Sequence, residues 1–203
     1  MSSLDYDPTF GTYLRLLAVT GCRTGEALAL RWRDIKIDEQ AQSGEILISH
    51  SIAKTTAGSV EKDTKTHQSR RLAIGPGTIT TLIAHRQSCN ARAQACGLTI
   101  TDDSFLFSSA LDASIPWRPD VMTNRFIRLT KELGIEKIRL HDLRHYVATS
   151  LGAAGTPIAT ISTRLGHRDR ATTLNVYSHS MPALDVQASQ VVEELLDGEQ
   201  IPC

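Results

Sequence analysis

Apolar side chains recur every three to four positions near the start of the chain, which is the spacing of one face of a helix. Residues 9–19 predict a helix with Leu16 and Leu17 on one side. Thr24 is expected to cap a second, short helix over residues 24–30. The opening of the chain therefore predicts two consecutive helices.

The period then changes from that of a helix to that of a strand. Ile35 and Ile37 alternate with polar residues, and a second apolar run over residues 46–52 follows a Gln-Ser-Gly turn at residues 42–44. Residues 70–74 predict a third strand. Together these segments predict a small antiparallel β-sheet.

Helical patterning returns in the second half of the chain, where glycines mark the ends of helices. Thr156 is expected to cap one helix, with Pro157 at its first helical position. The other helical segments cover residues 78–96, 120–133, 141–154 and 184–196, and Asp169 is expected to cap a segment that leads to Tyr177. The predicted fold class is mainly α (α+β), a helical domain with a small antiparallel β-sheet.

The composition is that of one globular domain. The chain has 203 residues, of which 41% are hydrophobic, and this predicts a single domain over residues 1–203. No apolar run reaches the ~20 residues that cross a bilayer, and the first residues lack the basic and apolar regions of a signal peptide. We therefore expect a cytoplasmic protein without a membrane partner.

Charge is unevenly distributed along the chain, although the net charge is zero. Residues 51–100 contain seven basic and two acidic side chains, whereas the segment after Arg170 contains five acidic residues and no basic one. Sixteen of the 22 basic residues are arginine, the side chain that binds phosphate groups with two parallel hydrogen bonds. This distribution permits a nucleic acid as partner without identifying one.

One short segment, H-D-L-R-H at residues 141–145, concentrates groups that can carry chemistry. In a helix, His141, Arg144 and His145 lie on one face, because residues three and four apart are neighbours. The two histidines could chelate a metal ion, His141 and Arg144 could bind a phosphate group, or all three could form a solvated polar face. The segment by itself leaves these interpretations open.

Arg23 lies in a glycine-flanked turn at the start of a predicted helix, where backbone N–H groups and the positive end of the helix favour an anion. A surface arginine in a turn is the alternative interpretation. Farther along the chain, His167 ends an L-G-H sequence and precedes Tyr177 by ten residues. Either of these two residues alone would be interpreted as structural.

Taken together, these segments resemble the tyrosine recombinases, the phage integrase family. The resemblance extends from about Phe10 to His179 and includes the ten-residue interval between His167 and Tyr177. The matching segments are G-x-R-x-x-E-x-x-x-L-x-W-x-D at residues 21–34, T-K-T-x-x-S-R-R at 64–71, H-x-L-R-H at 141–145, L-G-H at 165–167 and T-T-x-x-x-Y at 172–177.

The resemblance implies a catalytic domain that cuts and rejoins DNA strands through a 3′-phosphotyrosine link. Arg23 and Arg144 would bind the non-bridging oxygens of the scissile phosphate and stabilise the charge that builds on them, and Tyr177 would be the nucleophile. The implied catalytic set is Arg23, Lys65, His141, Arg144, His167 and Tyr177.

The resemblance also implies roles for the other members of this set. His141 would be the base that accepts the phenol proton, His167 would donate to a non-bridging oxygen, and Lys65 would protonate the departing 5′ oxygen. Two roles stay open for Glu26, Asp142 and His145: support of the catalytic residues, or a purely structural role.

The implied partner is double-stranded DNA, bound by a homo-oligomer that is a tetramer on DNA and a monomer as the isolated domain, at the nucleoid. No cofactor and no metal ion are expected, because arginines take the place of metal ions in stabilising charge. An N-terminal core-binding domain, which family members carry, is expected to be absent from this chain. The segment of about residues 183–203 is expected to dock on a neighbouring protomer, with folding back onto its own domain as the alternative.

Three other functions compete with site-specific recombination as interpretations of the sequence. A type IB topoisomerase shares the chemistry, but the L-G-H and H-x-L-R-H motifs favour a recombinase. A zinc hydrolase that uses His141 and His145 leaves Arg23, Lys65 and Tyr177 unexplained. A non-catalytic helical DNA-binding module does not account for the full catalytic set.

Overall fold

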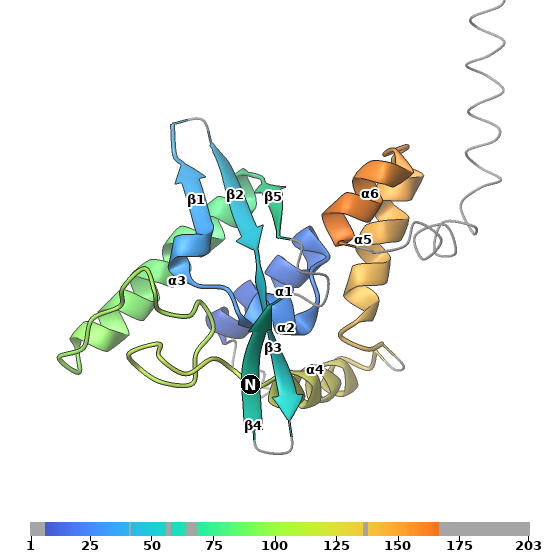
Figure 1. Cartoon of the computed structure of the whole chain (residues 1–203). Helices are drawn as coiled ribbons and strands as arrows, with labels where there is room; N and C mark the ends of the chain where they lie inside the picture. Colours follow the sequence, from blue (N-terminus) through green and yellow to red (C-terminus); the bar gives the residue numbers. More distant parts are fainter. Residues whose placement is uncertain (1–6, 41, 56–57, 64–68, 136–137, 167–203) are drawn as a thin grey trace, which may run out of the picture.

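The computed structural model describes residues 7–40, 42–55, 58–63, 69–135 and 138–166 (Figure 1). The helices are α1 Pro8–Thr20, α2 Thr24–Leu28, the 3₁₀ helix η1 Trp32–Asp34, α3 Pro76–Gln94, α4 Pro119–Glu132, α5 Asp142–Ala153 and α6 Ile158–Leu165. The strands are β1 Ile35–Asp38, β2 Ser43–Ile48, β3 His50–Thr55, β4 Gly58–Asp63 and β5 Arg70–Ile74. The predicted mainly helical class is confirmed. The segment that Asp169 was expected to cap and the helix expected over 184–196 lie outside the described residues.

The strands form two small antiparallel sheets instead of the single sheet expected from the sequence. One sheet has the order β1-β2-β5, and β3 pairs with β4 in a separate hairpin. The apolar run over residues 46–52 is divided at Ser49 between β2 and β3, which belong to different sheets. The sequence pattern does not predict β4, because its one apolar side chain, Val60, is 42% exposed.

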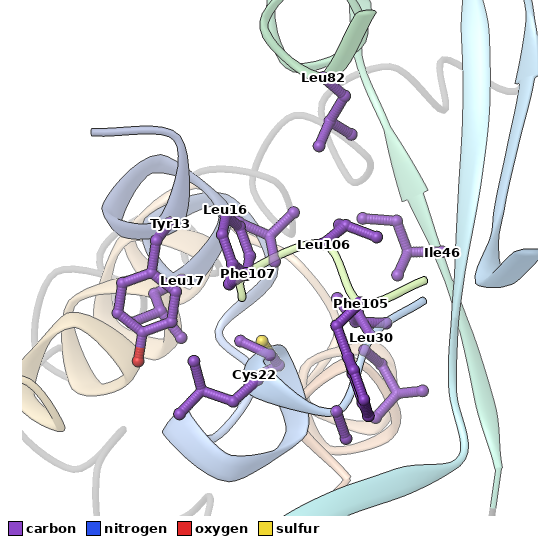
Figure 2. Packing of buried hydrophobic residues seen from close by; sticks show 14 of the residues in the cluster. Tyr13, Leu16, Leu17, Cys22, Leu30, Ile46, Leu82, Phe105, Leu106 and Phe107 are labelled. Carbon is purple, nitrogen blue, oxygen red and sulfur yellow. The ribbon is translucent and has the colours of Figure 1, made fainter. Parts of the chain in front are cut away.

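The main hydrophobic core joins α1, the three-stranded sheet and the segment around Phe107 (Figure 2). Leu16 and Leu17, which the sequence places on one side of the first helix, are both buried. Phe107 is fully buried and packs edge-on against Tyr13, with 5.2 Å between the ring centroids. Because full burial of such a side chain contributes roughly 1.5–3 kcal/mol, this irregular segment is an integral part of the core.

At two helices the residue that precedes the first turn differs from the N-cap predicted from the sequence. Arg23, and not Thr24, is the N-cap of α2, because the carboxylate of Glu26 accepts a hydrogen bond from the backbone N–H of Arg23 at 2.8 Å. Pro157, and not Thr156, precedes the first turn of α6, because its ψ of 136° is not helical.

Glycines end the helices in the left-handed conformation, as the sequence predicts. Gly97, Gly134 and Gly155 have φ values of 71°, 68° and 73°. Gly21 follows α1 with φ 65°, and a Cβ atom added there would lie 2.5 Å from Cδ2 of Leu165. Gly21 is therefore required both for its backbone conformation and for the close approach of α6.

α5 and α6 form a second, smaller hydrophobic cluster and lie together beside α1 and α2 (Figure 1). The buried residues of this cluster are Val147, Ala148, Ile161 and Leu165. Two of them, Val147 and Leu165, contact the backbone at Gly21, so the turn after α1 joins the second cluster to the main body. None of the helices in the described ranges has the length and apolarity that a bilayer crossing requires.

We predict that Gly21→Ala destabilises the protein more than Gly97→Ala. Both glycines have positive φ, so each change introduces a backbone strain of about 1–2 kcal/mol. At Gly97 a Cβ meets nothing within 4 Å, whereas at Gly21 it also collides with Leu165, and such overpacking adds roughly 1–3 kcal/mol. Urea denaturation of both variants measures the difference, and equal losses of stability would show that α6 does not press on this turn.

Candidate active site

Arg23 is positioned by the turn between α1 and α2. As the N-cap of α2, it has an extended backbone, and its guanidinium is held at two points. Nη1 donates to Oε1 of Glu26 at 2.8 Å, and Nη2 donates to the carbonyl of Gly166 at 3.3 Å. The side chain keeps 40% of its surface exposed, so it is fixed in direction and still accessible to an anion.

Arg144 lies in the first turn of α5 and is 5% exposed. Its Nη1 donates to the carbonyl of Gly21 at 2.7 Å, and its Nη2 donates to the carbonyl of Leu165 at 2.6 Å. Burial, together with the positive charges of Arg23 and Arg70, lowers the pKa of Arg144 to about 10. The guanidinium therefore stays protonated at neutral pH while being held next to Arg23.

The carboxylate of Glu26 is buried between two arginines. It accepts hydrogen bonds from the backbone N–H and the Nη1 of Arg23 and from Nη2 of Arg70, the last at 2.7 Å. Burial alone would raise the pKa of Glu26, but the hydrogen bond and charge of Arg70 and the contacts of Arg23 outweigh burial and hold this pKa below its ordinary value. Glu26 is thus an ionised structural support of Arg23.

Arg70 is a member of the cluster that the sequence interpretation did not include in the catalytic set. It is the first residue of β5, and its Nε donates to the carbonyl of Arg164 at 2.9 Å while its guanidinium pairs with Glu26. A signal was present in the sequence, because Arg70 belongs to the T-K-T-x-x-S-R-R motif. That motif gives no indication that Arg70 is buried whereas its neighbour Arg71 is exposed.

His141 is the N-cap of α5 and, like His145, it is exposed. Of the three interpretations of this segment, a wholly solvated polar face does not hold, because Arg144 is buried and donates to the carbonyls of Gly21 and Leu165. The two histidine rings pack edge-on with 5.1 Å between their centroids. His141 is nevertheless partly shielded from water by its neighbours, and this partial desolvation, with the positive charges of His145 and Arg144, lowers its pKa and favours the neutral, proton-accepting ring.

Three residues of the predicted catalytic set, Lys65, His167 and Tyr177, lie outside the described residues. The structure brings Arg23 and Arg144 together, and the chain that continues to His167 passes through Gly166, whose carbonyl accepts from Arg23. Within the described ranges, no three potential ligands of a metal ion gather in one place, so His141 and His145 find no third ligand there.

The chain matches the sequence model of the phage integrase family over residues 8–183. It is 28% identical over 192 residues to the ICEBs1 integrase of Bacillus subtilis, a match that covers 92% of this chain and 49% of that protein. It is 31% identical over 183 residues to the integrase of Staphylococcus phage L54a, with 88% of this chain and 50% of that protein covered.

Solved structures show the same fold. The XerH site-specific recombinase bound to difH superposes with a TM-score of 0.67 at 20% identity, over 96% of this chain and 48% of that chain. The Tn1549 transposon integrase in complex with a circular intermediate DNA gives a TM-score of 0.64 at 22% identity, over 82% of this chain and 53% of that chain.

The family match, together with the fold shared with the solved recombinases, defines the class of the protein as that of the tyrosine recombinases. The chain belongs to the phage integrase family. It spans about half the length of the curated relatives it matches.

We predict that Glu26→Gln costs about 3–5 kcal/mol of stability, because it leaves the buried guanidinium of Arg70 without its charged partner. Glu45→Gln is the matched control, since Glu45 pairs with the exposed Arg71 and its loss should cost about 0–1 kcal/mol. Denaturant unfolding at pH 7 measures both changes. Similar small effects would mean that the Glu26 pair contributes no more than a surface pair.

The same variant should change the pH dependence of stability. The pKa of Glu26 is lower in the folded protein than its ordinary 4.5, so its contribution is present above that ordinary value and is lost as the pH falls through the folded-state pKa. Glu26→Gln should therefore lose less stability on acidification than the wild type. An unchanged acid slope would contradict the lowered pKa.

Proposed function

We propose that this chain is the catalytic domain of a site-specific DNA recombinase that cleaves and rejoins strands through a 3′-phosphotyrosine intermediate at Tyr177. The observation that carries the proposal is the pair of arginines, Arg23 and Arg144, which two different helices bring to one place. Arg144 donates to the carbonyls of Gly21 and Leu165, and Arg23 donates to the carbonyl of Gly166, the residue that follows Leu165. The integrases and recombinases among the relatives support strand exchange over simple relaxation of DNA.

The arginine pair suits a phosphodiester substrate. Attack on the phosphorus atom adds negative charge to the non-bridging oxygens, and preorganised guanidinium groups stabilise that charge without first having to reorient. The buried Arg144 supplies a donor in a fixed position, and the half-exposed Arg23 presents the N–H donors of its planar guanidinium at the surface. A double-stranded DNA partner agrees with the solved complexes of XerH with difH and of the Tn1549 integrase with DNA.

The reaction then follows from the remaining residues of the set. The phenol oxygen of Tyr177 attacks the phosphorus, its proton passes to His141, and the bond to the 5′ oxygen breaks. Lys65 gives a proton to that leaving oxygen, and His167 donates to a non-bridging oxygen. Attack of a 5′-hydroxyl group on the phosphotyrosine reverses these steps, so rejoining needs no nucleotide cofactor.

Assembly is part of the proposal. The domain acts as a homo-oligomer on DNA, a tetramer when two duplexes are brought together, and is a monomer in isolation. The apolar strip over residues 191–196 is too short to fold alone, so it needs a surface to pack on. As the resemblance to the family implies, residues 183–203 dock on a neighbouring protomer. The protein works at the nucleoid in the cytoplasm, where its substrate is found.

We expect Tyr177→Phe to abolish covalent protein–DNA adducts, because it removes only the attacking oxygen. The probe is a pool of nicked duplexes with a randomised core, and adducts are detected as SDS-resistant complexes in buffer with EDTA. Tyr146→Phe is the matched control, since Tyr146 is a solvent-exposed tyrosine of α5 that has no part in the proposed chemistry. Adducts of undiminished yield in Tyr177→Phe, or a requirement for added metal ions, would contradict the mechanism.

Lys65→Ala should slow cleavage by about 10²–10⁴-fold, the usual value of general-acid help. The test uses the duplex recovered from the pool, with sulfur in place of the bridging 5′ oxygen, because a thiolate leaves without a proton. On this substrate Lys65→Ala should cleave almost as fast as wild type, whereas Arg23→Ala and Arg144→Ala should remain slow. An equal loss on both substrates would make Lys65 a phosphate contact instead of the acid.

A further inference from the structure

Arg70 contacts both groups that hold the catalytic arginine Arg23, namely the carboxylate of Glu26 and the turn at Gly166. The guanidinium of Arg23 donates to Oε1 of Glu26 and to the carbonyl of Gly166. Arg70 donates to both oxygens of the same carboxylate, at 2.7 Å to Oε2 and 3.3 Å to Oε1. Through Nε it also donates to the carbonyl of Arg164, two residues before Gly166.

The contact between Arg70 and the turn after α6 is close. Gly166 has φ +67°, and a Cβ atom added there would lie 2.7 Å from Nη1 and 3.0 Å from Cζ of Arg70. The side chain of Arg70 is 9% exposed, so its position is determined by these neighbours and not by solvent. The backbone of Gly166 therefore rests on the guanidinium of Arg70 while its carbonyl receives Arg23.

We propose that Arg70 is a positioning residue of the phosphate clamp, the pair formed by Arg23 and Arg144. Arg70 orients Arg23 by fixing both the carboxylate of Glu26 and the turn at Gly166. This inference rests on the proposed recombinase function. An arginine suits the task because its planar group can pair with a carboxylate and donate to a carbonyl at the same time, which a lysine ammonium on one flexible chain cannot do with the same geometry. A displaced Arg23 would stabilise the transition state less.

The neighbouring residue offers a matched control. Side chains alternate along a strand, and Arg71 points to the other side of β5, where it is 50% exposed and pairs with Glu45 of β2. Arg71→Met thus removes a positive charge from the same strand without touching Glu26 or Gly166. A general loss of attraction to DNA would affect Arg70→Met and Arg71→Met alike.

The first measurement is the cleavage rate of the 203-residue chain on the nicked duplex recovered from the randomised pool. Arg70→Met should cleave about 10²-fold more slowly than wild type, the usual consequence of misplacing a catalytic group by about 1 Å. Arg71→Met should cleave at the wild-type rate, and Arg70→Lys should recover part of the loss. Wild-type cleavage by Arg70→Met, or an equal loss in Arg71→Met, would overturn the proposal.

A second substrate separates positioning of the clamp from general damage to the fold. A methylphosphonate at the scissile position replaces one charged oxygen by a methyl group, so it reduces the need for a guanidinium at that oxygen. The defect of Arg70→Met should shrink on the same diastereomer that relieves Arg23→Ala. A defect of the same size on ordinary and methylphosphonate DNA would show that Arg70 only stabilises the fold. If instead the 5′-sulfur substrate restored cleavage by Arg70→Met, Arg70 would act through Lys65.

A double variant covers the case in which Arg70→Met folds poorly. Removing both charges of a buried pair is less harmful than removing one, so Glu26→Gln/Arg70→Met should be more stable than either single variant. Its cleavage should stay as slow as that of Arg70→Met, and recovery of cleavage along with stability would overturn the proposal. Failure of the proposed recombinase function is distinguishable from failure of the Arg70 proposal. It would be seen in the first experiment, as a wild-type chain that forms no Tyr177-dependent adduct with any duplex of the pool.

Discussion

The buried carboxylate of Glu26 is the interaction on which the rest of the site depends. Three guanidinium groups, those of Arg23, Arg70 and Arg144, come together at the junction of α2, α5, α6 and β5, and positive charges at such short range repel one another. Glu26 offsets this repulsion, and its two oxygens give Arg23 and Arg70 fixed directions. The arginines of the proposed phosphate site are thereby held in place by the protein itself.

Backbone carbonyls complete this arrangement, and they link the site to the fold. Arg144 is held by the carbonyls of Gly21 and Leu165, so the clamp exists only when the turn after α1 lies against the end of α6. The same approach leaves no room for a side chain at Gly21. The site is consequently complete only when the small α5–α6 cluster docks on the main core.

In the proposed mechanism, guanidinium groups stabilise the charge that builds on the phosphate. In many enzymes of phosphate chemistry, metal ions held by carboxylates neutralise the developing charge. Here the buried carboxylate of the described part of the site pairs with two arginines and orients them. Lys65, the proposed general acid, precedes Arg70 by only five residues along the chain.

The sequence by itself determined the mainly helical class, the glycine ends of the helices and, through ordered motifs, the family, because these features depend on local spacing. It also assigned Arg23 and Arg144 to one predicted site, and the structure brings the two side chains together. Only the tertiary structure decided that the strands divide into two sheets, that the segment around Phe107 enters the core and that Arg144 is buried. It also decided that Arg70, and not Arg71, faces Glu26. The physical reason is distance along the chain: Arg144 meets Gly21 across 123 positions and Arg70 meets Arg164 across 94, and no local pattern encodes which carbonyl a distant guanidinium will find.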